Sequence, residues 1–156
     1  IAYTPFGELT VFVFFGLVAV VGTSYVQLER VTGLAVLAAV PVGLLACALL
    51  VVNNLRDIPT DRPAGKRTLA VLLGDRASRW LYLGLVAGAF GLAVVIALVR
   101  TPWALLTLGA LPVAVRPALA IRSGANGRAL IPVLRDTARV QLGFGLLLAA
   151  GLALAG

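Results

Sequence analysis

Asparagine, aspartate and basic residues gather in one short stretch of this chain, between positions 53 and 68. The stretch contains two carboxamides, two carboxylates and four cations: Asn53, Asn54, Asp57, Asp61, Arg56, Arg62, Lys66 and Arg67. Asp57 and Asp61 are four residues apart, so on a helix they would lie on one face. Mg²⁺ prefers hard oxygen ligands and is usually held by one or two carboxylates together with substrate phosphates. The stretch therefore predicts a site for a divalent metal and a diphosphate.

The basic residues of the stretch could bind the remaining phosphate charge, arginine through a bidentate fork and lysine as a point charge. Pro59 disfavours a helical conformation at Ile58. We therefore expect the preceding helix to end near residue 58, with Asp61 on a turn.

Two other interpretations give this stretch no catalytic role. In the first, the arginines only set membrane topology and the aspartates only pair with them. Topology has no use for paired carboxamides at the end of an apolar helix, which weakens this interpretation. In the second, the basic loops of the chain bind anionic lipid in a non-catalytic membrane module.

The elements that must position the stretch are apolar. Of the 156 residues, 61% are hydrophobic and 12% are charged, with a mean hydropathy of +1.05, whereas a soluble domain is about half apolar and a quarter charged. The chain is therefore a membrane protein, and its net charge of +7 indicates loops at a membrane surface rather than nucleic-acid binding. The chain has no histidine, which excludes imidazole catalysis and the usual zinc sites within it.

Five transmembrane helices are predicted, giving an all-α polytopic bundle. The stretches 9–28, 31–55 and 81–99 carry no charge and are close to the ~20 residues that spanning requires. A run over 103–115 spans the membrane if its helix continues to residue 121, and the last run, 140–156, needs one further turn from its polar side.

Smaller features are predicted around these helices. A short helix over 68–73, ended by Gly74, should lie in the membrane interface. Gly84, Gly88 and Gly91 share one face of the third helix and should allow a close approach of a neighbouring helix. Candidate walls for an apolar ligand are the phenylalanines at positions 12, 14, 15 and 90.

Basic residues are divided unevenly between the predicted loops. Two loops contain eleven of them: Arg56, Arg62, Lys66, Arg67, Arg76 and Arg79 in the first, and Arg116, Arg122, Arg128, Arg135 and Arg139 in the second. The other two connections contain only Arg30 and Arg100. Because basic loops stay in the cytoplasm, we expect the polar stretch to face the cytoplasm from the inner cell membrane. The chain would then start inside and end outside.

The stretch and its surroundings resemble a known family. Residues 53–74 follow the pattern N-N-x-R-D-x-x-x-D-x-x-x-G-K-x-T-L-A-V-x-x-G, which is similar to the second aspartate-rich motif of the UbiA superfamily of intramembrane prenyltransferases. The Asn-Asn-x-Arg start, Gly7-Glu8 and Gln27 most resemble the branch that prenylates 1,4-dihydroxy-2-naphthoate in menaquinone synthesis. Pro59 and Pro63 depart from the family pattern. The resemblance covers essentially the whole chain.

The resemblance implies a fold of nine helices, of which the five here correspond to helices five to nine. Residues 1–156 would then be the C-terminal portion of one prenyltransferase domain. The chain contains no methionine, and we expect it to be a piece of a longer protein. The family's first aspartate-rich motif has no counterpart here, so the chain would hold half of a catalytic centre. It would be inactive alone and would need the preceding helices of the same protein.

The resemblance also implies a reaction. Asp57 and Asp61 would coordinate Mg²⁺ bound to the diphosphate of a polyprenyl donor. Supporting contacts to the diphosphate would come from Asn53, Asn54, Arg56, Lys66 and Arg67. The polyprenyl group would pass to 1,4-dihydroxy-2-naphthoate with loss of its carboxylate, giving demethylmenaquinone. Another aromatic acceptor is the alternative within the family.

Overall fold

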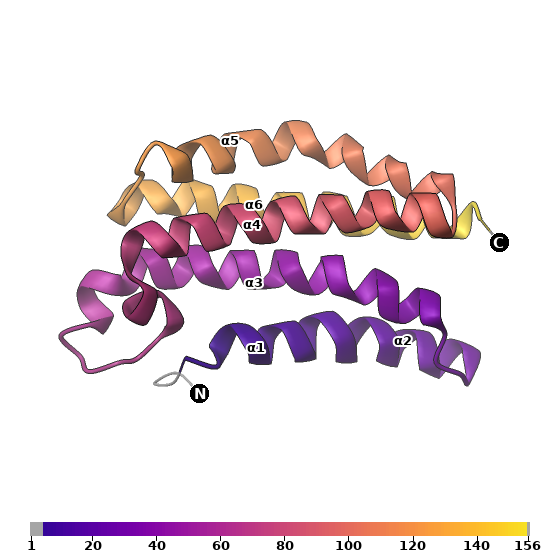
Figure 1. Cartoon of the computed structure of the whole chain (residues 1–156), viewed down its shortest axis with the longest axis horizontal. Coiled ribbons are helices and arrows are strands. Elements are labelled where there is room, and N and C mark those ends of the chain that lie inside the picture. The colour runs from indigo at the N-terminus through magenta and orange to yellow at the C-terminus, as the bar shows by residue number, and fades with distance from the viewer. Residues whose placement is uncertain (1–4, 156) are drawn as a thin grey trace.

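A computed structural model describes residues 5–155, which form a bundle of helical rods (Figure 1). The first rod runs without interruption through α1 (Gly7–Val11), the π-helix η1 (Phe12–Val18) and α2 (Ala19–Leu28). The later elements are α3 (Gly33–Asp61), α4 (Leu69–Val99), the 3₁₀-helix η2 (Pro102–Ala110), α5 (Leu111–Arg122), η3 (Gly127–Ala129) and α6 (Leu130–Ala153). The predicted all-α bundle is confirmed.

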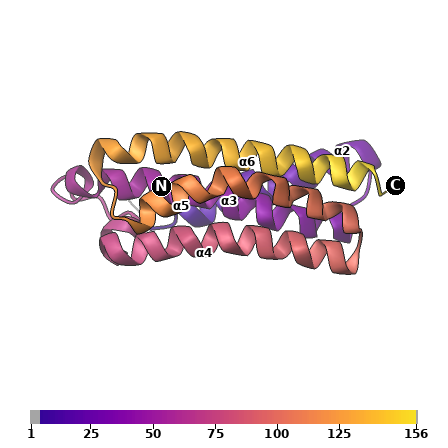
Figure 2. The same ribbon diagram turned by 90° about the horizontal axis from the view of Figure 1, so that it is seen from above.

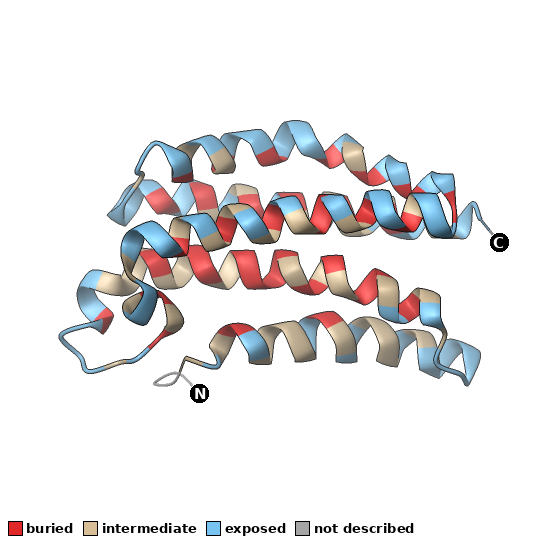
Figure 3. Ribbon diagram, in the orientation of Figure 1, coloured by how far each residue is buried: buried red, intermediate tan, exposed pale blue. Residues whose placement is uncertain are grey.

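Helix α3 lies between the first rod and the rest of the bundle (Figure 1). On its other side α4 and α6 run next to it, and the rod formed by η2 and α5 packs across both of them (Figure 2). The burial pattern follows this arrangement, since buried positions are densest on α3 (Figure 3). Many of them are small, such as Ala39 and Ala48, which lets neighbouring helices approach closely. The fold thus builds its centre around the helix that ends in the polar stretch.

Four helical segments are long and apolar enough to cross a membrane: Gly7–Leu28, Gly33–Asp61, Leu69–Val99 and Pro102–Arg122. Large apolar side chains such as Val26 and Leu98 point outward, as expected for surfaces in contact with lipid tails. Helix α6 has 24 residues, about 36 Å of helix, but its first half contains Arg135, Asp136 and Arg139. The predicted fifth span is therefore present as a helix, and its crossing of the membrane stays a prediction. Residue 156, at its predicted end, lies outside the described residues.

The two basic loops lie at the same end of the bundle. The connection between α3 and α4 and the connection between α5 and α6 both fall at the left of Figure 1, opposite the α2–α3 turn and the end of α6. This is the arrangement that the distribution of basic residues predicts. The side of the membrane that this end faces stays a prediction.

The predicted end of the second long helix near residue 58 is wrong. Helix α3 continues through Pro59 to Asp61, so Asp61 is helical and not on a turn. A proline removes the hydrogen bond that its own N–H would donate and crowds the carbonyl four residues earlier. The helical bonding nevertheless continues beyond Pro59, with the Arg62 N–H donating to the Ile58 carbonyl at 3.1 Å. Pro59 sits in the last turn of the helix, where that loss interrupts little.

The predicted short helix after the polar stretch is present. The Thr68 hydroxyl accepts a hydrogen bond from the Val71 N–H at 3.3 Å and caps the start of α4. Gly74 then leaves the helical conformation, with φ 78° and ψ 173°, values open to glycine and strained for other residues. Because of this break, residues 69–73 form a separate turn before the long part of α4.

The close contacts between helices differ from the predicted glycine face. A side chain added at Gly84 or Gly91 would meet nothing within 4 Å among the described residues. Close approaches lie instead between the first rod and α3, where a Cβ atom built on Gly16 would be 2.7 Å from the Gly43 Cα, and between α6 and η2, where a Cβ atom built on Gly151 would meet the Trp103 carbonyl group. Of the three glycines only Gly88 lies near another described helix, with a built Cβ atom 3.4 Å from Leu44 Cδ1 of α3, an ordinary van der Waals distance. The predicted face as a whole is therefore not a tight interface of this bundle.

Candidate functional site

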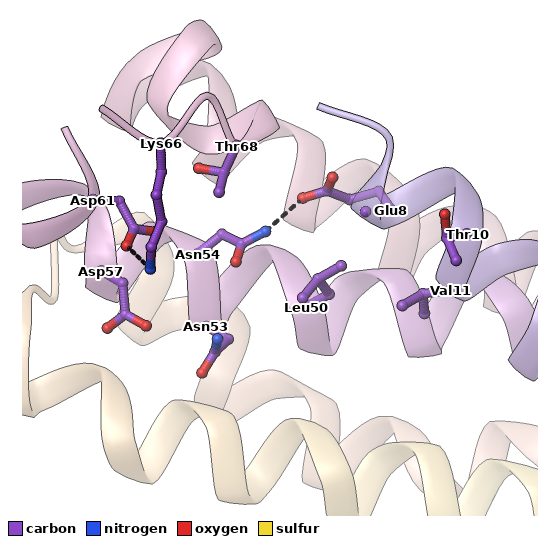
Figure 4. A pocket seen from close by; sticks show the side chains of 11 residues that line it. Glu8, Thr10, Val11, Leu50, Asn53, Asn54, Asp57, Asp61, Lys66 and Thr68 are labelled. Carbon is purple, nitrogen blue, oxygen red and sulfur yellow. Dashed lines mark hydrogen bonds and ion pairs between the residues drawn. The ribbon is translucent and has the colours of Figure 1, made fainter. Parts of the chain in front are cut away.

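A cavity of about 400 Å³ opens beside the last turns of α3 (Figure 4). Its walls come from three segments: the start of the first rod, the end of α3 and the loop that follows α3. The lining residues are Gly7, Glu8, Thr10, Val11, Leu50, Asn53, Asn54, Asp57, Asp61, Lys66 and Thr68. The cavity therefore brings together five of the seven predicted site residues.

Helix α3 presents the polar side chains to the cavity because of their spacing. Asn53, Asp57 and Asp61 follow one another at intervals of four residues and line the same wall, as helical geometry requires. The C-terminal end of a helix carries partial negative charge, which favours cations and disfavours carboxylates. Two aspartates in the last two turns therefore need positive partners at this end of α3.

Arg56 provides the first positive partner. Its Nε donates to Asp57 Oδ1 at 2.7 Å and its Nη2 donates to Asp57 Oδ2 at 2.9 Å, a bidentate pair. The same Nη2 also donates to Asn53 Oδ1 at 3.0 Å. The Arg56 and Asp57 side chains are each about one-third exposed, at 31% and 32%. This network fixes the orientation of Asp57 while leaving it accessible from the cavity.

Lys66 provides the second positive partner. Its Nζ donates to Asp61 Oδ1 at 2.6 Å, and the Asp61 side chain is buried while that of Lys66 is about one-third exposed. The intervening loop turns back on itself at Gly65, which has φ 70°, and the Lys66 N–H donates to the Asp61 carbonyl at 3.0 Å. The loop thereby returns Lys66 to the helix end and places an ammonium group in the cavity.

Glu8 is a cavity residue that the sequence analysis did not assign to the site. It lies in α1, with only 8% of its surface exposed. Its Oε1 accepts a hydrogen bond from Asn54 Nδ2 at 2.9 Å (Figure 4), and its backbone carbonyl accepts from Cys47 Sγ at 3.1 Å. The available signal was a carboxylate placed directly before a long apolar run, although Asn54, its partner, is 46 residues away along the chain.

Two of the predicted phosphate contacts do not line the cavity. Arg56 is hydrogen-bonded to Asp57 and Asn53, which line the cavity, but it does not line the cavity itself. Arg67 is exposed in the loop. Among the phenylalanines predicted to form apolar walls, Phe90 is a core residue. The centroid of its ring lies 5.3 Å from the centroid of the Phe144 ring, in an edge-to-face contact. Phe15 lines a second cavity, described next.

A second, apolar cavity of about 460 Å³ lies next to the first. The two share Val11, Leu50 and Asn53. The other lining residues of the second are Phe15, Ala46, Leu49, Leu134 and Gln141. A ligand with a charged head and an apolar tail would find matching surroundings in the pair.

The donor set of the polar cavity fits Mg²⁺ only in company with a phosphate. Within residues 5–155 no three acidic, histidine or cysteine side chains are grouped as a metal site. Asp57 and Asp61 supply two carboxylates, and Asn53 and Asn54 supply carboxamide oxygens, all of them hard ligands. Two carboxylates completed by substrate phosphates and water are the usual protein share of a magnesium site, so the residues present suit that metal.

Similarity to known proteins identifies the family of the chain. The model of the UbiA prenyltransferase family matches residues 2–134. The chain is 53% identical over 151 residues to a 1,4-dihydroxy-2-naphthoate octaprenyltransferase of Mycobacterium tuberculosis, covering 97% of this chain and 51% of that protein. Proteins with the same name from Mycobacterium leprae and Escherichia coli are 47% and 35% identical, over 99% and 96% of this chain.

The chain spans about half the length of the curated relatives it matches. The matched regions cover 51%, 52% and 49% of the proteins from Mycobacterium tuberculosis, Mycobacterium leprae and Escherichia coli, respectively. The family match includes the first rod, α3, α4, α5 and the start of α6, and so the whole polar cavity. This chain belongs to the UbiA prenyltransferase family.

Proposed function

We propose that this chain forms part of a Mg²⁺-dependent prenyltransferase that moves a polyprenyl group from its diphosphate to 1,4-dihydroxy-2-naphthoate. The acceptor loses its carboxylate in the reaction, and the product is a demethylmenaquinone. The observation that carries the proposal is the cavity at the end of α3, where Asp57, Asp61 and Lys66 lie together beside an apolar cavity. The names of the relatives supply the acceptor.

The polar residues at the end of α3 and the following loop have distinct roles in this proposal. Asp57 and Asp61 would hold the metal, and Asn53 and Asn54 would bind the donor head through their carboxamides. Lys66 and Arg56 now neutralise the two aspartates and would turn to phosphate oxygens when the diphosphate is bound. When bound, Mg²⁺ supplies positive charge that stabilises the departing diphosphate. The apolar cavity would hold the first part of the polyprenyl tail and exclude water from the electrophilic carbon.

The site would be completed by residues outside this chain. We propose that residues 1–156 are the C-terminal portion of one prenyltransferase domain, in which preceding helices contribute a second set of carboxylates. The isolated chain should then show no transfer. We further propose that the protein lies in the inner cell membrane with the cavity open to the cytoplasm. The cavity is lined by Asp61, Lys66 and Thr68, which belong to the end of α3 and the connection to α4, at the end of the bundle where both basic loops lie (Figure 1).

Aspartate-to-asparagine variants of the full-length protein test the proposal. In membrane vesicles given the donor, the naphthoate and Mg²⁺, Asp57→Asn and Asp61→Asn should each lower transfer by about 100-fold or more, since each removes charge that stabilises the transition state. Asp75→Asn is the matched control. Asp75 is exposed and pairs with Arg79, away from the cavity, so this variant should keep the activity of the unsubstituted protein.

The same variants separate a transferase from a lipid-binding module. A non-catalytic module would be indifferent to Asp57→Asn and would lose binding to anionic vesicles when Arg122, Arg128 and Arg135 are replaced. Full activity of both aspartate variants would contradict the proposed function. Activity with other aromatic hydroxy acids, and none with the naphthoate, would replace the acceptor and leave the reaction class in place.

A further inference from the structure

Glu8 has a carboxylate oxygen that the bundle does not use. Its Oε1 is bonded to Asn54 Nδ2, whereas Oε2 is buried and has no hydrogen-bond partner within the described part of the chain. Leaving a buried carboxylate oxygen unpaired is unfavourable. Glu8 lines the polar cavity, so a ligand in that cavity could supply the missing donor.

The chemistry of Glu8 decides which ligand that is. A diphosphate is an anion that a carboxylate repels, and the cation that suits it, Lys66, lies beside Asp61 at the end of α3. Nor does Glu8 form a three-carboxylate group with Asp57 and Asp61 among residues 5–155. A hydroxyl group on a molecule other than the polyprenyl donor suits this oxygen, because it can donate the missing hydrogen bond.

The surroundings of Glu8 suit a flat apolar ring that carries such a hydroxyl. Val11 and Leu50 line the same cavity and would pack against the faces of an aromatic ring. They also line the apolar cavity, so a ring bound here would lie where the polyprenyl tail meets the polar site. A carboxylate on the ring would be repelled by Glu8 and would point away from it.

We propose that Glu8 binds the aromatic acceptor by accepting a hydrogen bond from one of its hydroxyl groups at Oε2. This inference rests on the proposed function, since it takes the acceptor to be a dihydroxynaphthoate. It adds a carboxylate from the first rod to the site and assigns that carboxylate to the acceptor, not to the metal or the donor.

A purely structural role for Glu8 must be separated from this one. Glu8 also joins the first rod to α3 through Asn54 and through the Cys47 contact to its backbone carbonyl. Glu8→Gln keeps both contacts, because the amide oxygen still accepts the hydrogen bond from Asn54 and the backbone carbonyl that Cys47 contacts is unchanged. It replaces Oε2 with an NH₂ group, which donates and cannot accept. Glu29→Gln is the matched control, since Glu29 is exposed at the other end of the same rod.

The experiment measures steady-state transfer by the full-length protein in vesicles, varying donor, naphthoate and Mg²⁺ in turn. For Glu8→Gln we expect the KM for the naphthoate to rise about 10- to 100-fold, the range for losing a charge-assisted hydrogen bond. The KM for the polyprenyl donor, the Mg²⁺ concentration that gives half the maximal rate (the Mg²⁺ midpoint) and the Tm should stay unchanged. Glu29→Gln should match the unsubstituted protein throughout.

Naphthoates that lack one hydroxyl provide a second readout. The unsubstituted protein should bind one of the two monohydroxy compounds much more weakly than the dihydroxy acid, whereas Glu8→Gln should not distinguish that compound from the dihydroxy acid. A shifted Mg²⁺ midpoint would make Glu8 a metal ligand and overturn the inference. A lowered Tm with equal changes in both KM values would make it structural, with the same consequence.

Failure of the inference and failure of the proposed function look different in this assay. If the unsubstituted protein prenylates the naphthoate and Glu8→Gln has an unchanged KM for it, only the inference is overturned. If the unsubstituted protein prenylates no aromatic hydroxy acid, both are overturned.

Discussion

Replacing Gly16 with alanine should push the first rod slightly away from α3 and destabilise the bundle. A Cβ atom at this position would be 2.7 Å from the Gly43 Cα, 3.2 Å from the Gly43 nitrogen and 3.3 Å from the Ala39 carbonyl oxygen. Carbon atoms in contact normally lie about 3.5–4.0 Å apart. All three neighbours are backbone atoms, so no side chain can rotate away and the two helices would have to move apart by roughly 1 Å.

The expected cost follows from two opposing effects. Overpacking of this kind costs about 1–3 kcal/mol. Alanine in place of glycine in a helix regains up to about 1 kcal/mol. The net effect should be a loss of about 1–2 kcal/mol in the free energy of unfolding, because the contact is between backbones and cannot relax locally.

Gly22→Ala is the control, since it makes the same chemical change in the same rod. A Cβ atom at Gly22 would meet nothing within 4 Å in the described structure, so only the helix-propensity gain should remain. The assay is thermal unfolding of the full-length protein in detergent micelles. Gly16→Ala should lower the Tm and Gly22→Ala should leave it unchanged or raise it slightly. A Gly16→Ala protein as stable as Gly22→Ala would refute the close contact.

Three further outcomes are expected. Tyr82→Phe should lower the free energy of unfolding by about 0.5–1.5 kcal/mol, measured by thermal unfolding, because it removes the buried 2.9 Å hydrogen bond to Thr137 that joins α4 to α6. Chelation by EDTA should stop prenyl transfer in vesicles and added Mg²⁺ should restore it; transfer that persists in EDTA would contradict the magnesium site. In a Cys47→Ala background, Ala64→Cys should resist an impermeant maleimide in intact cells and Val31→Cys should react with it, and the opposite pattern would reverse the proposed orientation.

The helices themselves could be predicted because each depends on a local property. Long apolar runs without charge require backbone hydrogen bonds to be satisfied within the segment, and only a helix achieves this inside a membrane. The face shared by Asn53, Asp57 and Asp61 follows from helix geometry in the same way. The end of α3 was misjudged because a rule about one residue, Pro59, was applied without the hydrogen bonds formed beyond it.

Contacts between distant segments could not be predicted from spacing. Gly84, Gly88 and Gly91 have the spacing of a packing face, but no described helix approaches Gly84 or Gly91 closely. Gly16 and Gly43 do pack backbone against backbone, yet nothing in their local sequences relates one to the other. The place of Glu8 in the cavity could not be predicted for the same reason, since its hydrogen-bond partner Asn54 is 46 residues away along the chain.

The Gly16–Gly43 contact is the point about which the first rod would tilt relative to α3. Eight residues separate Gly16 from Glu8, a lever arm of about 12 Å along the helix. A tilt of roughly 5° about that point would move Glu8 by ~1 Å, as much as a hydrogen bond tolerates. The position of the Glu8 carboxylate thus depends on a backbone contact about 12 Å away, in addition to the contacts that Glu8 itself makes with Asn54 and Cys47.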